Sequence, residues 1–153
     1  MSQLAANVHS LLLPVETGML LLPNAAVAEI VDYREPEGPG EAPPWYLGRV
    51  SWRGLQVPLV AFEAIDGAAP GAEQGLRIAI LNTLNANPQV PFIGIVLRGI
   101  PRLLNAGTEA ISPTGAPASG AAALSRVQVA DAEAVIPDLD ALERLVAELP
   151  PAA

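Results

Sequence analysis

Short apolar runs divided by Pro and Gly constrain the fold of this chain most strongly. The sequence has 153 residues and is 51% hydrophobic, but 16 prolines and 13 glycines divide its apolar stretches. A strand needs only about four to eight residues between turn signals, whereas a helix needs about ten or more. The pattern therefore predicts a mostly β protein with few long helices, and at this length a single domain is expected.

The clearest hairpin lies in the middle of the chain. Residues 46–52 (YLGRVSW) and 55–62 (LQVPLVAF) are separated only by Arg53 and Gly54. Gly54 can adopt the positive φ of a tight reversal, and the β-branched and aromatic residues on both sides favour strands. The pattern predicts a cation at the turn beside the ring of Trp52. Arg and Trp are the residue types that most often anchor protein interfaces.

Further strands are expected on both sides of this hairpin. Residues 8–13 and 19–22 predict a first hairpin, and Asn24 is expected to cap a short helix that continues to Glu29, before extended residues 30–33. Residues 76–84 and 90–97 are apolar almost throughout, which predicts an antiparallel pair buried on both faces.

Three segments have the composition of connections. Residues 34–44 and 66–75 are rich in Pro, Gly and Ala, which predicts an exposed loop and a flexible connection. Residues 104–125 consist mainly of Ala, Gly, Ser, Thr and Pro, which predicts a long mobile connection with one short strand near residues 110–111.

The end of the chain predicts its one long helix. Residues 127–129 and 134–136 favour a last hairpin, after which Pro137 and Asp138 open a helix. Its apolar face has three- and four-residue spacing and consists of Leu139, Leu142, Leu145, Val146 and Leu149. We expect a flexible N-terminus over residues 1–7, one domain over residues 8–149 and a flexible tail over residues 150–153.

The charge of the chain disfavours nucleic-acid and membrane-surface partners. Sixteen acidic residues against eight arginines give a formal charge of -8, which repels phosphates and anionic lipids. Residues 1–7 carry no basic residue of the kind that begins a secretory signal. Polar residues and prolines interrupt the uncharged stretch 78–96, so no membrane insertion is expected. These features predict a cytoplasmic protein.

Catalytic and metal-binding equipment is not expected either. The chain has no Cys and one His, His9, which stands alone in an apolar run where a buried or edge histidine is the ordinary interpretation. The tightest carboxylate pair, Asp138 and Asp140, is explained by helix capping and the helix dipole. No phosphate-binding loop or nucleophile elbow is present. We therefore expect no enzyme activity, no cofactor and no metal site.

The order and spacing of several motifs resemble the CheW-like domain of bacterial chemosensory adaptors. These motifs are residues 27–30 (VAEI), 44–48 (PWYLG), 52–60 (WRGLQVPLV), 92–100 (FIGIVLRGI) and 135–142 (VIPDLDAL). The resemblance implies two small five-stranded SH3-like β-barrel subdomains that share a hydrophobic core, with a C-terminal α-helix. It also implies a scaffold in a two-component system that couples the cytoplasmic tip of methyl-accepting chemoreceptors to the regulatory domain of a CheA-type histidine kinase. Other CheW-like proteins are further expected partners.

The same resemblance selects candidate partner-binding and structural residues. The partner-binding candidates are Val27, Glu29, Trp45, Tyr46, Trp52, Arg53, Arg98 and Arg102, and the structural candidates are Gly48, Gly54 and Gly94. Two interpretations of Arg53 remain open, namely an exposed interface anchor and a brace that bonds backbone carbonyls or a nearby carboxylate. The three aromatics could instead pack in the barrels, and Glu29 could be a solvated helix carboxylate.

Departures from the family pattern indicate a divergent paralogue. Ser51 and Trp52 stand where Asn and Leu are usual, Ala61 replaces a common acid, and Arg98 and Arg102 occupy commonly acidic positions. Reversed charge on a recognition surface predicts a different partner, because like-charge contacts are costly.

Such divergence is similar to that of the ChpC-like proteins of pilus-associated chemosensory systems, which implies control of twitching motility. An adaptor of this kind would offer a receptor helix an apolar groove between the barrels. The alternative function is a small-molecule-binding β-barrel sensor with a closed apolar cavity.

Overall fold

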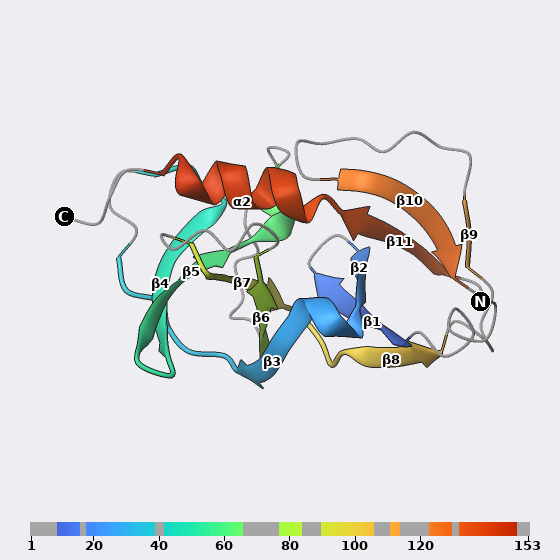
Figure 1. The fold of residues 1–153 in the computed structure, drawn as a ribbon, viewed down its shortest axis with the longest axis horizontal. Coiled ribbons are helices and arrows are strands. Elements are labelled where there is room, and N and C mark those ends of the chain that lie inside the picture. Colours follow the sequence, from blue (N-terminus) through green and yellow to red (C-terminus); the bar gives the residue numbers. More distant parts are fainter. Residues whose placement is uncertain are drawn as a thin grey trace.

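The structure is a computed structural model. It describes residues 9–15, 18–38, 42–65, 77–83, 90–105, 111–113, 123–129 and 132–149. These residues form two β-sheets and one α-helix (Figure 1). The expected flexible ends, the connection over residues 66–75 and the turn between the two central apolar runs lie outside the described residues.

The first sheet combines the beginning and the end of the chain. Its strand order is β8-β1-β2-β11-β10-β9. The strands are β1 (His9–Val15), β2 (Gly18–Pro23), β8 (Arg102–Asn105), β9 (Ile111–Pro113), β10 (Ala123–Val129) and β11 (Ala132–Pro137). The N-terminal hairpin and the C-terminal hairpin meet where β2 and β11 pair in parallel, at Leu20 and Val135.

The second sheet is built from the middle of the chain. Its order is β3-β6-β7-β5-β4, and its strands are β3 (Val27–Asp32), β4 (Tyr46–Trp52), β5 (Leu55–Val60), β6 (Arg77–Asn82) and β7 (Phe92–Leu97). β6 and β7 are antiparallel, and residues 78–81 and 93–97 are all buried. Burial on both faces of this pair confirms the prediction from its continuous apolar runs.

A shared core joins the two sheets. Leu13, Leu20 and Leu22 of the first sheet belong to the same buried cluster as Leu81 and Ile95 of the second. Two smaller clusters lie within the individual sheets. Because apolar side chains of both sheets are removed from water together, each subdomain depends on the other for part of its stability.

The helix α2 (Leu139–Ala147) adds Leu142 and Val146 to this core. The side chain of Asp138 accepts a hydrogen bond from the backbone N–H of Ala141, so the capping explanation for this acid is confirmed. The predicted fold class is confirmed: a mostly β domain of two small subdomains with a shared core and a C-terminal helix. The first sheet carries β9 as an additional short strand.

Two sequence-based predictions need correction. Asn24–Ala26 is a single 3-10 turn, η1, without a side-chain cap, and β3 begins at Val27. Val27 and Glu29 therefore lie on a strand, because pairing with β6 outweighs the local helix signal, and very short helices are marginal. The span 104–125 contains the end of β8, all of β9 and the start of β10. β9 lies close to the short strand predicted there; the rest of the span is outside the described residues.

Within the described ranges, no helix has the length and hydrophobicity needed to cross a bilayer.

Candidate functional site

The turn between β4 and β5 consists of Arg53 and Gly54. Trp52 pairs directly with Leu55, so the loop has two residues. Arg53 has φ 49° and Gly54 has φ 77°, as a type I′ turn requires at both central positions. Gly54 adopts this conformation at no steric cost, whereas a non-Gly residue is disfavoured by about 1–2 kcal/mol. The turn geometry by itself does not favour an arginine at position 53.

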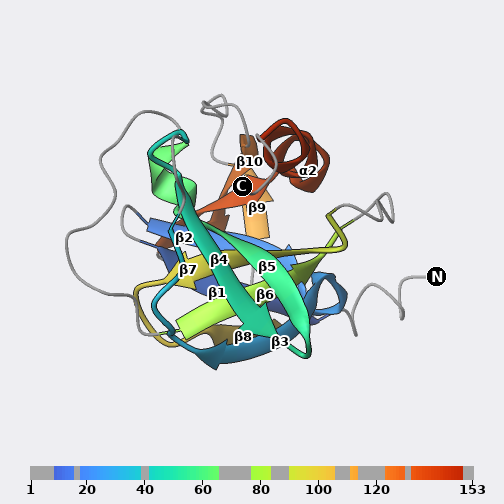
Figure 2. The same ribbon diagram turned by 90° about the vertical axis from the view of Figure 1, so that its left-hand side faces the viewer.

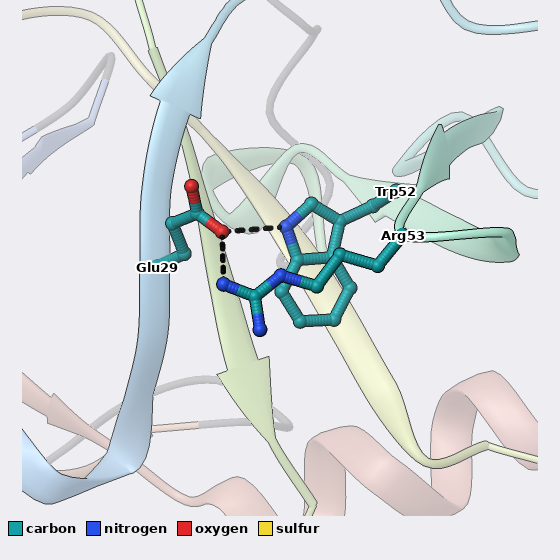
Figure 3. Close-up of polar contacts among 3 residues, drawn as sticks. All are labelled: Glu29, Trp52 and Arg53. Atoms are coloured by element: carbon teal, nitrogen blue, oxygen red, sulfur yellow. Dashed lines mark hydrogen bonds and ion pairs between the residues drawn. The ribbon is translucent and has the colours of Figure 1, made fainter.

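The Arg53 side chain is both braced and exposed. Its guanidinium lies 4.8 Å from the centroid of the Trp52 ring, and Nη2 is 3.0 Å from Oε1 of Glu29 (Figure 3). The same carboxylate oxygen accepts a hydrogen bond of 3.0 Å from Nε1 of Trp52. Yet 68% of the Arg53 side chain remains exposed. The two interpretations of Arg53 are therefore compatible.

The contacts of Glu29 join the two edges of the second sheet. β3 and β4 are the outer strands of that sheet, and Glu29 lies on β3 while Trp52 ends β4. Nη1 of Arg34, just after β3, donates to the backbone oxygen of Ser51 at 2.7 Å. These side-chain bonds thus connect β3 and β4, which are not neighbouring strands in the sheet. Glu29 is not simply a solvated carboxylate, since it links two strands.

Gly48 permits a backbone bridge beside this seam. Glu37 and Arg49 exchange both backbone hydrogen bonds, at 2.8 and 3.1 Å. Gly48 has φ 120°, and a Cβ on it would overlap the carbonyl oxygen of Glu37. At Gly94, a Cβ would lie 3.1 Å from Cγ2 of Ile78. These contacts support the expected structural role of both glycines.

The three aromatic candidates lie inside the protein. Trp52 is 6% exposed, Trp45 8% and Tyr46 9%. Trp52 packs edge-on against Phe92 with ring centroids 4.8 Å apart, while Trp45 and Tyr46 belong to the shared core with Leu142. In a chain with few aromatics these large rings are used to fill the interior. Of the two interpretations left open for these rings, a contact surface and packing in the barrels, their burial supports the second.

Arg98 also points inward. Its side chain is 13% exposed, and Nη2 is 3.4 Å from Oε1 of Glu63, whose side chain is fully buried. A buried charge requires an opposite charge nearby, and Glu63 provides it. The positive charge at position 98 is therefore paired with Glu63 inside the fold and is not presented to a partner. Arg102, on β8, is exposed and remains a surface candidate.

Among the residues that the structure describes, three large apolar side chains that were not selected from the sequence are exposed. They are Leu55 (40%), Ile100 (75%) and Leu103 (58%). Ile100 lies just before β8 and Leu103 lies in it. β8 is an edge strand that was not predicted from the sequence, because its four residues are too few to show a strand pattern.

The strands and turns that carry these residues, Arg53 and Glu29 lie on one side of the fold. In both views the β4–β5 turn, β3 and β8 lie along the lower side, with α2 on the upper side (Figures 1 and 2). We call this side the hairpin–β8 face and define it by Glu29, Arg53, Leu55, Ile100, Arg102 and Leu103. It spans both sheets, since β8 belongs to the first sheet and the other two elements to the second.

The chemistry of the hairpin–β8 face suits binding. It combines two cations with exposed apolar side chains, and among the described residues no group of three or more His, Cys, Asp or Glu could hold a metal ion. Side chains of the second sheet, among them Val50, Trp52, Leu59 and Ile80, form one buried cluster.

Tyr33 follows β3 beside the same seam. It packs partly buried against the second-sheet cluster. Burial raises the pKa of its phenol above the ordinary value, and the nearby Glu35 raises it further, while Arg98 acts in the opposite direction. The raised pKa keeps the Tyr33 phenol protonated to a higher pH than in an unfolded chain, which suits its packing role.

Comparisons with known proteins agree with this architecture. A family model described as the CheW-like domain matches residues 9–145. A crystal structure of the scaffolding protein TtCheW from Thermoanaerobacter tengcongensis is similar, with a TM-score of 0.69 and 17% sequence identity. The match covers 87% of this chain and 85% of that chain, and at this identity it supports the fold. No curated protein matches the sequence closely enough to count as a relative.

Proposed function

The chain belongs to the CheW-like domain family, and on that premise we propose that it is a non-catalytic adaptor in chemosensory signal transduction. It couples the cytoplasmic tip of chemoreceptors to the regulatory domain of a CheA-type histidine kinase, and it works in the cytoplasm without a cofactor. The observation that carries this proposal is the exposed Arg53 guanidinium, held at a left-handed turn position on a face with exposed apolar residues.

The geometry of Arg53 supports its use as an interface anchor. Stacking on Trp52 and pairing with Glu29 restrict the side chain before any partner arrives. A pre-organised side chain loses less entropy on binding, so more of its contact energy contributes to affinity. A left-handed arginine at this position is also an outlier of the kind that concentrates at functional sites.

The apolar part of the face supports a helical partner. Ile100 and Leu103 could pack against the apolar stripe of a receptor helix, as in helix-in-groove recognition. Arg53 and Arg102 would then meet carboxylates beside that stripe. Edge strands such as β8 and the β4–β5 hairpin are the elements that we propose for contact with the homologous domain of the kinase.

The test is calorimetric titration of the Arg53→Glu variant with a receptor cytoplasmic-tip fragment and with the kinase regulatory domain. We expect weaker binding to at least one of them while circular dichroism shows an intact fold. Arg144→Glu is the matched control, because the Arg144 side chain is also 68% exposed but lies on α2, on the opposite side. Unchanged affinity of Arg53→Glu for both partners would contradict the proposal.

For the output of the pathway we propose type IV pilus twitching motility. The support is Arg102, which stands exposed where the family commonly has an acid. A cation there favours partners that differ from those of a general flagellar adaptor. Deleting the gene should abolish twitching and leave swimming intact, and the reverse result would refute this assignment.

A further inference from the structure

The segment between β7 and β8 carries the chain from the second sheet to the first. Residues 98–101 form this crossover, and its main chain is attached to β1. The backbone N–H of Arg98 donates to the carbonyl oxygen of Pro14 at 2.8 Å. Gly99 lies against the same proline, since a Cβ on it would be 3.0 Å from Cγ of Pro14. The crossover is therefore fixed to the first sheet through its backbone.

The side chain of Arg98 fixes the same segment to the second sheet. Its partner Glu63 lies in η2 (Phe62–Ala64), which follows β5 after Ala61. Phe62 and Ala64, on both sides of Glu63, belong to the shared core. Glu63 is thus held in place by its neighbours, and Arg98 connects the crossover to it.

The geometry of this ion pair is poor for stability. The Nη2–Oε1 distance of 3.4 Å is longer than that of a strong charge-assisted hydrogen bond, about 2.7–2.9 Å. Oε2 of Glu63 is buried, and no described residue donates a hydrogen bond to it. A buried ion pair of this kind is often no more stabilising than apolar side chains of similar volume, and its better-attested use is to specify one arrangement.

Two exposed residues depend on the crossover for their position. Ile100 is two residues from Arg98, and Leu103 lies on β8, which pairs with β1 at the edge of its sheet. We propose that Glu63 and Arg98 are a positioning pair, which fixes Ile100 and Leu103 relative to the β4–β5 turn so that one partner can contact both parts of the hairpin–β8 face. This inference rests on the proposed function, because it concerns the same surface.

The test replaces the pair by apolar side chains, Glu63→Leu with Arg98→Met. We expect unchanged or higher stability in urea, because no charge is left buried without a partner. We expect the affinity for the receptor fragment to fall by about two- to thirty-fold, the range of couplings transmitted through a protein to a distant site. Amide hydrogen exchange at residues 99–105 should become faster while exchange in β6 stays the same.

The matched control is Glu133→Leu with Arg126→Met, the same replacement at the exposed pair between β10 and β11, which should change neither readout. Wild-type affinity together with wild-type exchange in the Glu63 and Arg98 variant would overturn the positioning pair. Should the wild type itself not bind the fragment, or Ile100→Asp not weaken binding, the proposed function fails. Amide exchange at residues 99–105 then decides the positioning pair alone.

Discussion

Replacing Arg53 by asparagine separates the two roles of this residue. Asparagine adopts the left-handed conformation more readily than arginine, so the turn geometry at φ 49° is retained. The substitution removes the stacking on Trp52 and the ion pair with Glu29. Glu29 keeps its hydrogen bond from Nε1 of Trp52, so its carboxylate is not left without a partner.

The expected change in the free energy of unfolding is small because the contributions oppose each other. In the lost ion pair the Arg53 side chain is 68% exposed and the Glu29 side chain 40% exposed. Such an exposed pair contributes about 0.2–1 kcal/mol. The lost stacking contributes about 0.5–1 kcal/mol at an exposed site. Asparagine tolerates the left-handed conformation at position 53 better than arginine, which offsets these losses by about 1 kcal/mol. Arg53→Asn should therefore remain within about 1 kcal/mol of the wild type.

Urea denaturation of Arg53→Asn and Arg53→Ala measures this balance. Alanine loses the same contacts without gaining the left-handed preference, so it should be the less stable variant by about 1 kcal/mol. Both variants should nevertheless lose partner affinity. A loss of more than about 2 kcal/mol in Arg53→Asn would show that Arg53 contributes more than an exposed pair can. The brace would then contribute more than the contacts of an exposed residue explain. Unchanged partner affinity of both variants would refute the interface argument.

Three further predictions concern the fold. Leu142→Ala should lower the free energy of unfolding by about 2–5 kcal/mol, because Leu142 is fully buried in the shared core, and thermal denaturation should stay a single transition. Separate transitions for the two subdomains would contradict the shared core. Gly48→Ala should destabilise the protein in urea far more than Gly38→Ala, since a Cβ at position 38 meets no atom of the described residues within 4 Å. The pKa of Tyr33 is higher in the folded state than in the unfolded state. The contribution of its protonated phenol to the free energy of unfolding is therefore fully present below pH 10 and is lost as the pH rises through the folded-state pKa. Tyr33→Phe should remove that part of the decline, and an identical pH profile in the variant would exclude it.

Local signals in the sequence determined most of the elements. The β4–β5 hairpin was predictable because a two-residue turn with Gly54 connects two runs of strand-forming residues. The helix α2 was predictable because Asp138 caps it and its apolar spacing is regular. The burial of β6 and β7 followed from their unbroken apolar runs. In each case the deciding interactions are between residues close in sequence, or depend only on the pattern of hydrophobicity.

The family was also predictable from the sequence alone, because the order and spacing of the motifs match the family pattern even where single residues differ from it. It could not assign the surroundings of individual side chains. Glu29 was expected on a helix, and Arg98 on a recognition surface, whereas the structure pairs Glu29 with Trp52 and Arg98 with Glu63.

Only the tertiary structure decided which residues are left on the surface. Exposure of Ile100 and burial of Trp45 depend on which strands become edges and which side chains fill the shared core. Those outcomes are set by contacts between segments far apart in the sequence, such as the 35 residues that separate Glu63 from Arg98. No local preference encodes such a contact, because its free energy exists only once both segments have been brought together by the rest of the fold.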